Sequence, residues 1–512
     1  MSRAILSRMH AIRFAPLLLF AACSTFEKSS SLYDSVGGAN GPPGADQGGA
    51  EPAPGLLLPE KEVEELFQTP VATGRYLWVA NPTSGRVAYI DAVTLEVVTV
   101  PAGNAPTHVA AIGQLESTIV INVLSQDATL LALEDGALNT TTYPLAAGMN
   151  AWSTSADGRF AIAWSDARKI PSAAKTLGFQ DLTVVDLQTK TSTVLSVGYR
   201  PTAIRYNTAA TTAFAVTSDG ISVVALDDPL GPMLVRNVRL AATPEEQAKI
   251  ADVTIRPDGS MALARITDSP DLVVANLATG IVSRLTLADT PTDLDLTATG
   301  NAAIAVMRGS STLGWITLGD PPSVTTYPLP VDGMGSASLA SGAEVAVLYT
   351  NATDTEDVTI ASLSPTFSAR ASRVYARVLA AYLTPLGTSA VILHDTAAGQ
   401  GAFSLLPLAM DLPAKIVSTV DAPRFVALSA DSTRALVVAK TSAFLCKLPS
   451  FATQEIKLSS MPLTAGIVEG AKRAFISQSH PAGRVSFIDL QTGEARTLTG
   501  FELQARIVGG QK

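Results

Sequence analysis

A segment of about 44 residues recurs roughly ten times between Arg75 and the C-terminus, and this period constrains the fold more than any other feature. The best-preserved part of each repeat is a short apolar run that ends in an acidic or polar residue, as in VAYID at 87–91, LTVVDL at 182–187 and VSFIDL at 485–490. Valine, isoleucine and threonine alternate along such runs, and turn residues separate them. The repeating unit therefore consists of β-strands.

Each repeat holds four predicted strands. The first follows a small or proline-containing segment, as in PTHVAAI at 106–112, and a tight turn such as Asp157-Gly158 joins it to the second. The second is apolar, as in RFAIAW at 159–164, the third is the run described above, and the fourth is rich in threonine, as in TSTVLSVG at 191–198. Several short strands in a period of about 40–50 residues are typical of an all-β chain folded as a β-propeller.

We expect residues 75–512 to form one ring of about ten four-stranded blades. Propellers usually have about 4–8 blades, so a pair of smaller rings is the alternative. The first repeat opens with the second-strand sequence YLWVAN at 76–81 and lacks a recognisable first strand, whereas FELQARIV at 501–508 is a spare strand at the other end. Pairing these two strands would close the ring and remove an exposed sheet edge.

Two insertions interrupt the regular spacing. KIPSAAKTLGFQD at 169–181 lengthens the connection between the second and third strands of the third repeat. DDPLGPM at 227–233, followed by TPEEQAKI at 243–250, enlarges the fourth repeat. Because insertions in repeat proteins fall in loops, we expect both to protrude from the ring and to be the first places to look for partner contacts.

The first repeat resembles the repeat of the YVTN family of β-propellers. The resemblance covers RYLWVANPTSGRVAYIDAVTLEVVTVPAGNAPTHVAA at 75–111 and extends to 182–205 and 485–499. The matching residues of the first repeat are Val79, Ala80, Asn81, Ser84, Gly85, Val87, Ile90, Asp91, Thr94, Gly103 and Pro106. The aspartate is expected to cap the turn after its strand. The resemblance implies a bacterial envelope or surface protein, and the matching residues build blades and carry no chemistry.

Residues 1–22 are predicted to be a secretion signal. Three arginines precede the apolar run 14–22, which is too short to span a bilayer because a spanning helix needs about 20 residues. The sequence FAAC at 20–23 resembles the lipobox of bacterial lipoproteins, which implies cleavage before Cys23 and attachment of lipid to its thiol. An ordinary signal-peptidase site beside an incidental cysteine is the alternative. Two acyl chains on Cys23 would anchor the chain stably in a membrane.

The residue after Cys23 is Ser24 rather than aspartate. Resemblance to enterobacterial lipoprotein sorting then implies the outer membrane of the bacterial cell envelope. Residues 23–74 are expected to hold the lipidated cysteine, a flexible tether rich in Ser, Gly and Pro, and a short lead-in, with a helix possible at 59–67. The predicted organisation is thus a signal at 1–22, an anchor and tether at 23–74, and a propeller at 75–512.

Charge and cysteine usage limit the partners. The net charge is −9 and becomes −12 when the three arginines of the signal are removed, and no basic run is present. This balance argues against a nucleic-acid partner. The second cysteine, Cys446, lies in the apolar strand AFLCKL, so we expect a buried and unreactive thiol.

Few residues suggest chemistry. Motifs for zinc, for a serine or metal-dependent hydrolase and for phosphate binding are absent, so no metal or cofactor is predicted. At the start of the first strands, which line a propeller channel, His108, Asp252 and Asp293 could face a common space with Arg424 nearby. A histidine with two carboxylates could bind a cation or transfer protons, whereas ordinary turn capping is the alternative.

Two functions remain open from the sequence. The first is a non-catalytic, lipid-anchored scaffold that binds a protein or polysaccharide partner, a possibility that includes an outer-membrane assembly factor. The second is a hydrolase similar to propeller lactonases, with its active site formed by the four channel-mouth residues. A fold alone does not decide between them.

Overall fold

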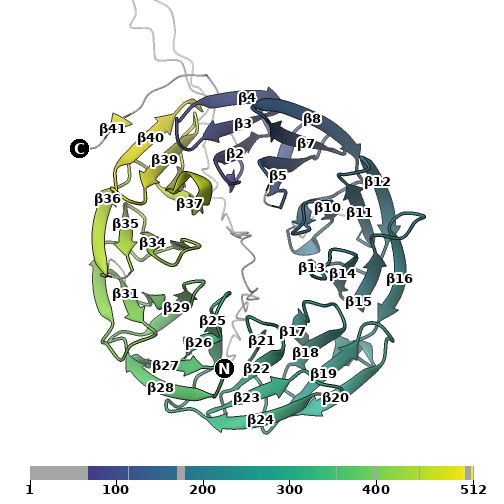
Figure 1. Ribbon diagram of the computed structural model, residues 1–512, viewed down its shortest axis with the longest axis vertical. Coiled ribbons are helices and arrows are strands. Elements are labelled where there is room, and N and C mark those ends of the chain that lie inside the picture. The colour runs from purple at the N-terminus through teal and green to yellow at the C-terminus, as the bar shows by residue number, and fades with distance from the viewer. Residues whose placement is uncertain are drawn as a thin grey trace, which may run out of the picture.

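The computed structural model describes residues 67–113, 115–169, 179–352, 354–396, 400–448, 450–501 and 509–510. The predicted signal, Cys23, the tether and most of the lead-in lie outside these residues. Within the described part, ten antiparallel sheets stand side by side around a central axis and form one closed ring (Figure 1). The predicted all-β propeller and the single ring of about ten blades are therefore confirmed.

Each sheet is one blade, and its strands follow one another in sequence from the axis to the perimeter. Blades one to five contain β1 (Val71–Ala72), β2 (Tyr76–Asn81), β3 (Arg86–Asp91), β4 (Val97–Pro101); β5 (Pro106–Ala111), β6 (Ser117–Asn122), β7 (Asp127–Glu134), β8 (Ala137–Pro144); β9 (Ala151–Thr154), β10 (Phe160–Trp164), β11 (Asp181–Asp186), β12 (Thr191–Ser196); β13 (Ala203–Tyr206), β14 (Thr212–Thr217), β15 (Gly220–Ala225), β16 (Met233–Val238); β17 (Ile250–Ile255), β18 (Met261–Ile266), β19 (Asp271–Asn276) and β20 (Val282–Thr286).

Blades six to ten contain β21 (Asp293–Leu296), β22 (Ala302–Met307), β23 (Thr312–Thr317), β24 (Ser323–Pro328); β25 (Ser336–Leu339), β26 (Val345–Tyr349), β27 (Asp357–Ser362), β28 (Ser368–Arg373); β29 (Val378–Leu383), β30 (Ser389–His394), β31 (Gly401–Pro407), β32 (Lys415–Thr419); β33 (Phe425–Leu428), β34 (Arg434–Val438), β35 (Ser442–Lys447), β36 (Ala452–Lys457); β37 (Pro462–Val468), β38 (Arg473–Gln478), β39 (Arg484–Asp489) and β40 (Ala495–Thr499). A two-residue strand, β41 (Gly509–Gly510), pairs with β40 at the outer edge of the tenth blade.

The burial of the strands explains their sequences. The second and third strands of a blade are covered on both faces by the neighbouring blades, so they read as continuous apolar runs; every residue of β10 and β22 is buried. The fourth strands form the perimeter and consist mainly of half-buried and exposed residues, as the threonine-rich β12 does. The cores lie between blades, as where Phe214 and Ile221 of blade four pack with Ala262 and Val273 of blade five.

Polar side chains secure the turns. The Asp91 carboxylate accepts hydrogen bonds from the backbone N–H groups of Val93 (2.8 Å) and Thr94 (3.2 Å), and Asp186 does the same two repeats later. The predicted capping role of the aspartate that ends the third strand is therefore confirmed. Asp91 also pairs with Arg75 at the start of the second strand, which ties the two strands together at that end.

The inner turns of neighbouring blades are joined by a recurring contact. A glutamate in the turn between the first and second strands of one blade accepts a hydrogen bond from the backbone N–H of the preceding blade's turn. Three such bonds occur among the described residues, from Arg75 to Glu116 (2.7 Å), from Thr299 to Glu344 (2.9 Å) and from Ala430 to Glu469 (2.8 Å).

The predicted closure of the ring by pairing the terminal strands is wrong. The first blade obtains its innermost strand from β1, which pairs with β2 in the register Val71↔Trp78 and Ala72↔Leu77. That edge of β2 is therefore occupied. Residues 502–508 of the predicted closing strand lie outside the described residues, and the strand β41 that follows them pairs with β40 at the perimeter. β1 could not be recognised in the sequence because two residues are too few to show the alternation of apolar and polar side chains that marks a strand.

Apolar packing between blades one and ten closes the ring. Leu77 and Ile90 of blade one share a core with Phe475 and Phe487 of blade ten. At the two ends of the domain, the rings of Phe67 and Phe501 meet with centroids 5.0 Å apart. The two ends of the propeller thus meet through the rings of Phe67 and Phe501, in contrast to the strand pairing expected from sequence.

The second insertion contains the only α-helix of the described residues, α1 (Pro244–Gln247), between blades four and five. Two 3₁₀ turns, Ala167–Lys169 and Glu469–Ala471, complete the helical structure of that part. None of these helices has the length and hydropathy needed to cross a membrane.

The observed closure makes a testable prediction. Because the ring closes through side-chain packing, deleting residues 502–512 should change the free energy of unfolding little, whereas Phe487→Ala should lower it by about 3–5 kcal/mol. Urea denaturation followed by tryptophan fluorescence measures both. A deletion that destabilised the protein as much as Phe487→Ala would contradict this closure.

Candidate functional site

The four predicted channel-mouth residues lie on four different blades. His108 is on β5 of blade two, Asp252 on β17 of blade five, Asp293 on β21 of blade six, and Arg424 directly precedes β33 of blade nine. Only the two aspartates are on neighbouring blades, whose strands β17 and β21 contact each other. β5 lies across the central opening from β21 (Figure 1).

Both aspartates have partners that belong to the ring. Asp252 occupies a bulge of β17 with a φ of 48° and forms an ion pair with Arg265 on the adjacent strand. Asp293 accepts a hydrogen bond from the backbone N–H of Ala337 in the next blade (2.8 Å), so it links blades six and seven. These contacts favour a structural role for the two carboxylates over a catalytic or cation-binding role.

His108 is half-buried and Arg424 is exposed. Burial, together with the nearby positive charge of Lys169, lowers the pKa of His108 to about 4, so the imidazole is neutral at pH 7. Arg424 contributes its backbone N–H to the carbonyl of Val438 (2.7 Å). Across the described ranges, no three or more His, Cys, Asp or Glu residues lie close enough together to hold a metal ion.

A second histidine has the contacts of a catalytic base. His394 Nε2 is 2.6 Å from Ser404 Oγ, and Nδ1 is 3.2 Å from the carbonyl oxygen of Arg377. Because a carbonyl only accepts, Nδ1 carries the proton and Nε2 accepts from the serine hydroxyl, as in a nucleophile–base pair. However, His394 is 1% exposed and Ser404 0%, so this pair belongs to the core of blade eight.

Cys446 is buried, as the sequence predicted. The residue is fully buried on β35, and burial raises the pKa of its thiol to about 12. The thiolate that nucleophilic or redox chemistry requires is therefore scarce at pH 7.

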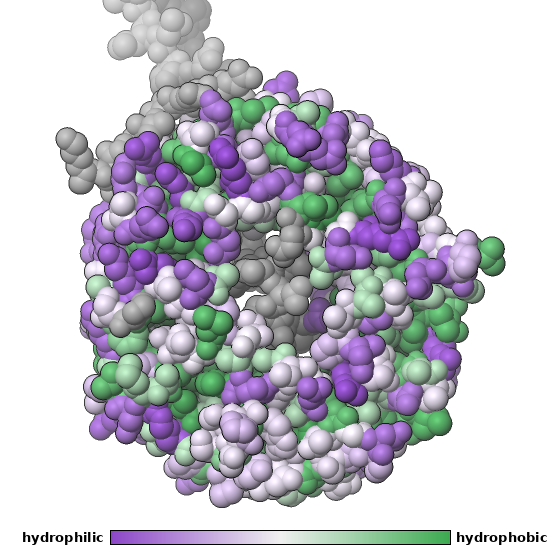
Figure 2. All heavy atoms as spheres, in the orientation of Figure 1, coloured by the Kyte–Doolittle hydropathy of each residue, from purple (hydrophilic) through white to green (hydrophobic). Residues whose placement is uncertain are grey.

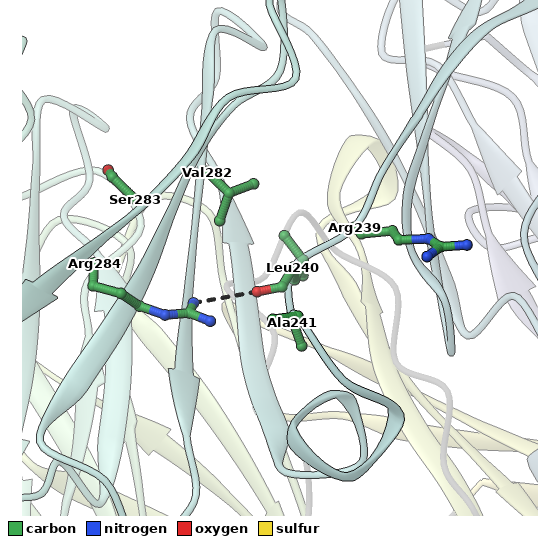
Figure 3. A pocket seen from close by; sticks show the side chains of 7 residues that line it. Arg239, Leu240, Ala241, Val282, Ser283 and Arg284 are labelled. Atoms are coloured by element: carbon green, nitrogen blue, oxygen red, sulfur yellow. Dashed lines mark hydrogen bonds between the residues drawn. The ribbon is translucent and has the colours of Figure 1, made fainter.

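A pocket of about 240 Å³ lies between Arg239–Ala242 and Val282–Arg284, where the second insertion meets β20 (Figure 3). The Arg284 guanidinium crosses it and donates to the carbonyl of Leu240 (3.2 Å). The same group pairs with Glu246 of α1 (2.6 Å), and the Arg239 side chain points away from it (Figure 3). The pocket is thus spanned by an arginine that fastens the insertion to blade five.

A third group of residues forms an exposed surface beside the first insertion. We call Arg168, Lys169, Phe179, Tyr199 and Arg200 the Tyr199 surface. The rings of Phe179 and Tyr199 meet edge to face with centroids 6.2 Å apart, and the Arg200 guanidinium lies 6.0 Å from the Tyr199 ring centre. Tyr199 is 44% exposed.

The backbone of the Tyr199 surface is fixed from several sides. The N–H of Tyr199 donates to the Asp219 carboxylate (2.7 Å), and its carbonyl accepts from Ser218 (2.8 Å). The N–H of Arg200 donates to the carbonyl of Phe179 (2.9 Å). The exposed side chains therefore project from a held loop, which lowers the entropy cost of binding.

Arg168 and Lys169 border this loop on the side of blade three. Arg168 donates to the carbonyl of Thr202 and pairs with the buried Asp166 (2.7 Å). Lys169 is exposed and close enough to His108 to lower its pKa. The Tyr199 surface thus extends from the connection between blades three and four toward the channel-mouth histidine.

Sequence reasoning found two of the five residues of this surface. It identified the insertion 169–181, which holds Lys169 and Phe179, as a place for contacts; residues 170–178 lie outside the described part. It missed Tyr199 and Arg200 because they belong to a loop of ordinary length. The available signal was an aromatic and a basic residue side by side in VGYRP, just before a proline that starts a blade.

The lowered pKa of His108 predicts a pH effect on stability. The unfolded chain takes up a proton near pH 6.5 and the folded chain only near pH 4, so this contribution is complete above pH 6.5 and is lost as the pH falls toward 4. Between pH 7.5 and pH 5, the wild type should lose about 2 kcal/mol more stability than His108→Gln. Urea denaturation at both pH values tests this, and equal losses would contradict it.

Comparisons with known proteins identify no family for this chain. No protein-family model and no curated protein matches the chain. Similar solved structures include the dihydro-heme d1 dehydrogenase NirN in complex with DHE (16% identity, TM-score 0.45, 75% of this chain and 73% of that one), a eukaryotic initiation factor (11%, 0.47, 88% and 96%) and the C-terminal WD40 domain of Sif2 (11%, 0.40, 78% and 98%). At these identities and scores, none of them carries an argument about the function of this chain.

Proposed function

We propose that this protein is a non-catalytic binding scaffold of the bacterial cell envelope, held at a membrane by lipid on Cys23. The observation that carries the proposal is the Tyr199 surface. It places an exposed aromatic ring and exposed cations on connections that a rigid ring fixes from both sides, and binding residues concentrate on such connections. Aromatic and arginine side chains are also enriched among the residues that dominate binding energy.

The envelope location is supported by the sequence. FAAC at 20–23 is similar to a lipobox, the following Ser24 favours the outer membrane, and residues 24–60 have the composition of a flexible tether. The resemblance of the first repeat to the YVTN family points to the same compartment. A tether of this length would let the ring reach partners beyond the lipid headgroups.

The hydrolase alternative has less support. It needs His108, Asp252, Asp293 and Arg424 to converge on one substrate, but these residues belong to blades two, five, six and nine. Asp252 and Asp293 also have structural partners in Arg265 and the Ala337 N–H.

The face drawn in Figure 2 mixes polar and apolar residues without a single large apolar area, which fits a polar and specific contact.

The anchor predicts the behaviour of the two cysteines. Cys23→Ala should abolish incorporation of labelled palmitate and move the protein from the membrane to the soluble fraction, whereas Cys446→Ala should keep both label and location. Metabolic labelling followed by fractionation measures the two effects. Label or membrane association that survives Cys23→Ala would contradict the anchor.

The scaffold predicts where partners lie. A photo-reactive phenylalanine analogue placed at position 199 in cells should crosslink to a defined envelope component. The same analogue at position 375, another exposed tyrosine, serves as the control. Equal products at both positions, or no product at 199 from a folded protein, would contradict this placement of the binding surface.

A further inference from the structure

We propose that the Tyr199 surface binds a carboxylate-bearing sugar, as found in acidic polysaccharides. This inference rests on the proposed function and names its ligand class. The sugar ring would stack on Tyr199, and its carboxylate would accept hydrogen bonds from Arg200, with Lys169 adding positive charge.

The charge of the surface favours an anionic group. Throughout the described ranges, Arg200 and Lys169 form no ion pair, and both are exposed. Arg168 is already matched by Asp166. Arg200, which has no carboxylate partner, therefore adjoins the Tyr199 ring, and Lys169 lies on the side of the surface that faces His108. The Asp219 carboxylate beside Tyr199 accepts the backbone N–H of that residue. A guanidinium binds a carboxylate through two parallel hydrogen bonds, which a lysine ammonium does not reproduce.

The aromatic part favours a flat, partly apolar ligand. Among the described residues, Tyr199 and Tyr375 are the aromatic side chains exposed by more than a third, at 44% and 49%. The edge-to-face contact with Phe179 holds the Tyr199 ring, so stacking costs little side-chain entropy. The C–H face of a pyranose ring is apolar and matches such a platform.

Tyr375 provides a comparison within the same chain. It lies in the connection between blades seven and eight, and Arg373 is 5.1 Å from its ring centre. However, the Arg373 guanidinium pairs with Glu356 (2.9 Å), and the neighbouring Arg377 pairs with Asp354 and Asp395. The two tyrosines therefore share exposure and an adjacent arginine but differ in whether a cation is left for a ligand.

Single-stranded nucleic acid is the other polymer that binds aromatic and basic residues. Its affinity depends on neutralising several successive phosphates. The Tyr199 surface offers two cations without a partner in an acidic chain, which suits one carboxylate per sugar better than a run of phosphates. Nucleic-acid binding is therefore an outcome of the test that would count against the proposal.

The test is calorimetric titration of the full chain in detergent micelles with a galacturonic acid tetramer. Its carboxyl-reduced form, a galactose tetramer, is the ligand control. Tyr199→Ala and Arg200→Gln should each weaken binding by about tenfold or more, which is the loss of one charge-assisted hydrogen bond or one stacking contact. Tyr375→Ala should leave the Kd within about twofold, and the reduced tetramer should bind about tenfold more weakly.

Tyr199→Phe separates stacking from loss of structure, because it keeps the ring and should retain binding. The proposal is overturned if the acidic tetramer does not bind, if both tetramers bind equally, if Tyr199→Ala and Tyr375→Ala have the same effect, or if a single-stranded oligonucleotide binds more tightly. If the tetramer fails while crosslinking from position 199 persists, the scaffold function stands and only the sugar assignment falls. If both fail, both proposals fall.

Discussion

Packing of each blade against its two neighbours is the constraint on which the whole structure depends. A four-stranded sheet with both faces apolar cannot stand alone in water, and the ring gives every blade a partner on each side. Closure is part of the same interaction: Phe475 and Phe487 of the last blade enter one core with Leu77 and Ile90 of the first. The last interface needs no shared strand because it is built like the other nine.

The polar groups in the turns mostly stabilise this ring. Asp91 and Asp186 cap turns, Glu116, Glu344 and Glu469 join neighbouring inner turns, and Asp293 links two blades through a backbone N–H. Asp293, which the sequence suggested as a candidate site residue, therefore has a structural contact. A regular ring requires such contacts because each tight turn leaves backbone N–H groups without a strand partner.

The proposed binding surface lies instead where the repeat is irregular. The first insertion brings Lys169 and Phe179 beside a loop that carries Tyr199 and Arg200. The Asp219 carboxylate, which accepts from the Tyr199 N–H, and the Ser218 N–H, which donates to the Tyr199 carbonyl, hold that loop. The second insertion is fastened by Arg284 and Glu246, so it fills the space between two blades. The two insertions thus have different consequences, since the first adjoins the exposed Tyr199 ring and the second is fastened to blade five by an ion pair.

The sequence by itself determined the all-β class, the four-strand repeat and the ring, because a period of about 44 residues and alternation within strands are local properties. It also determined the capping role of Asp91. Tertiary structure alone decided the rest: β1 is too short to show a pattern, so the closure had to be seen. Likewise, His108, Asp252 and Asp293 align at equivalent places in the repeat, with Arg424 nearby. The size of the ring and partners such as Arg265 determine which of these residues can act together. The Tyr199 surface joins residues from separate connections, and only their spatial proximity reveals it.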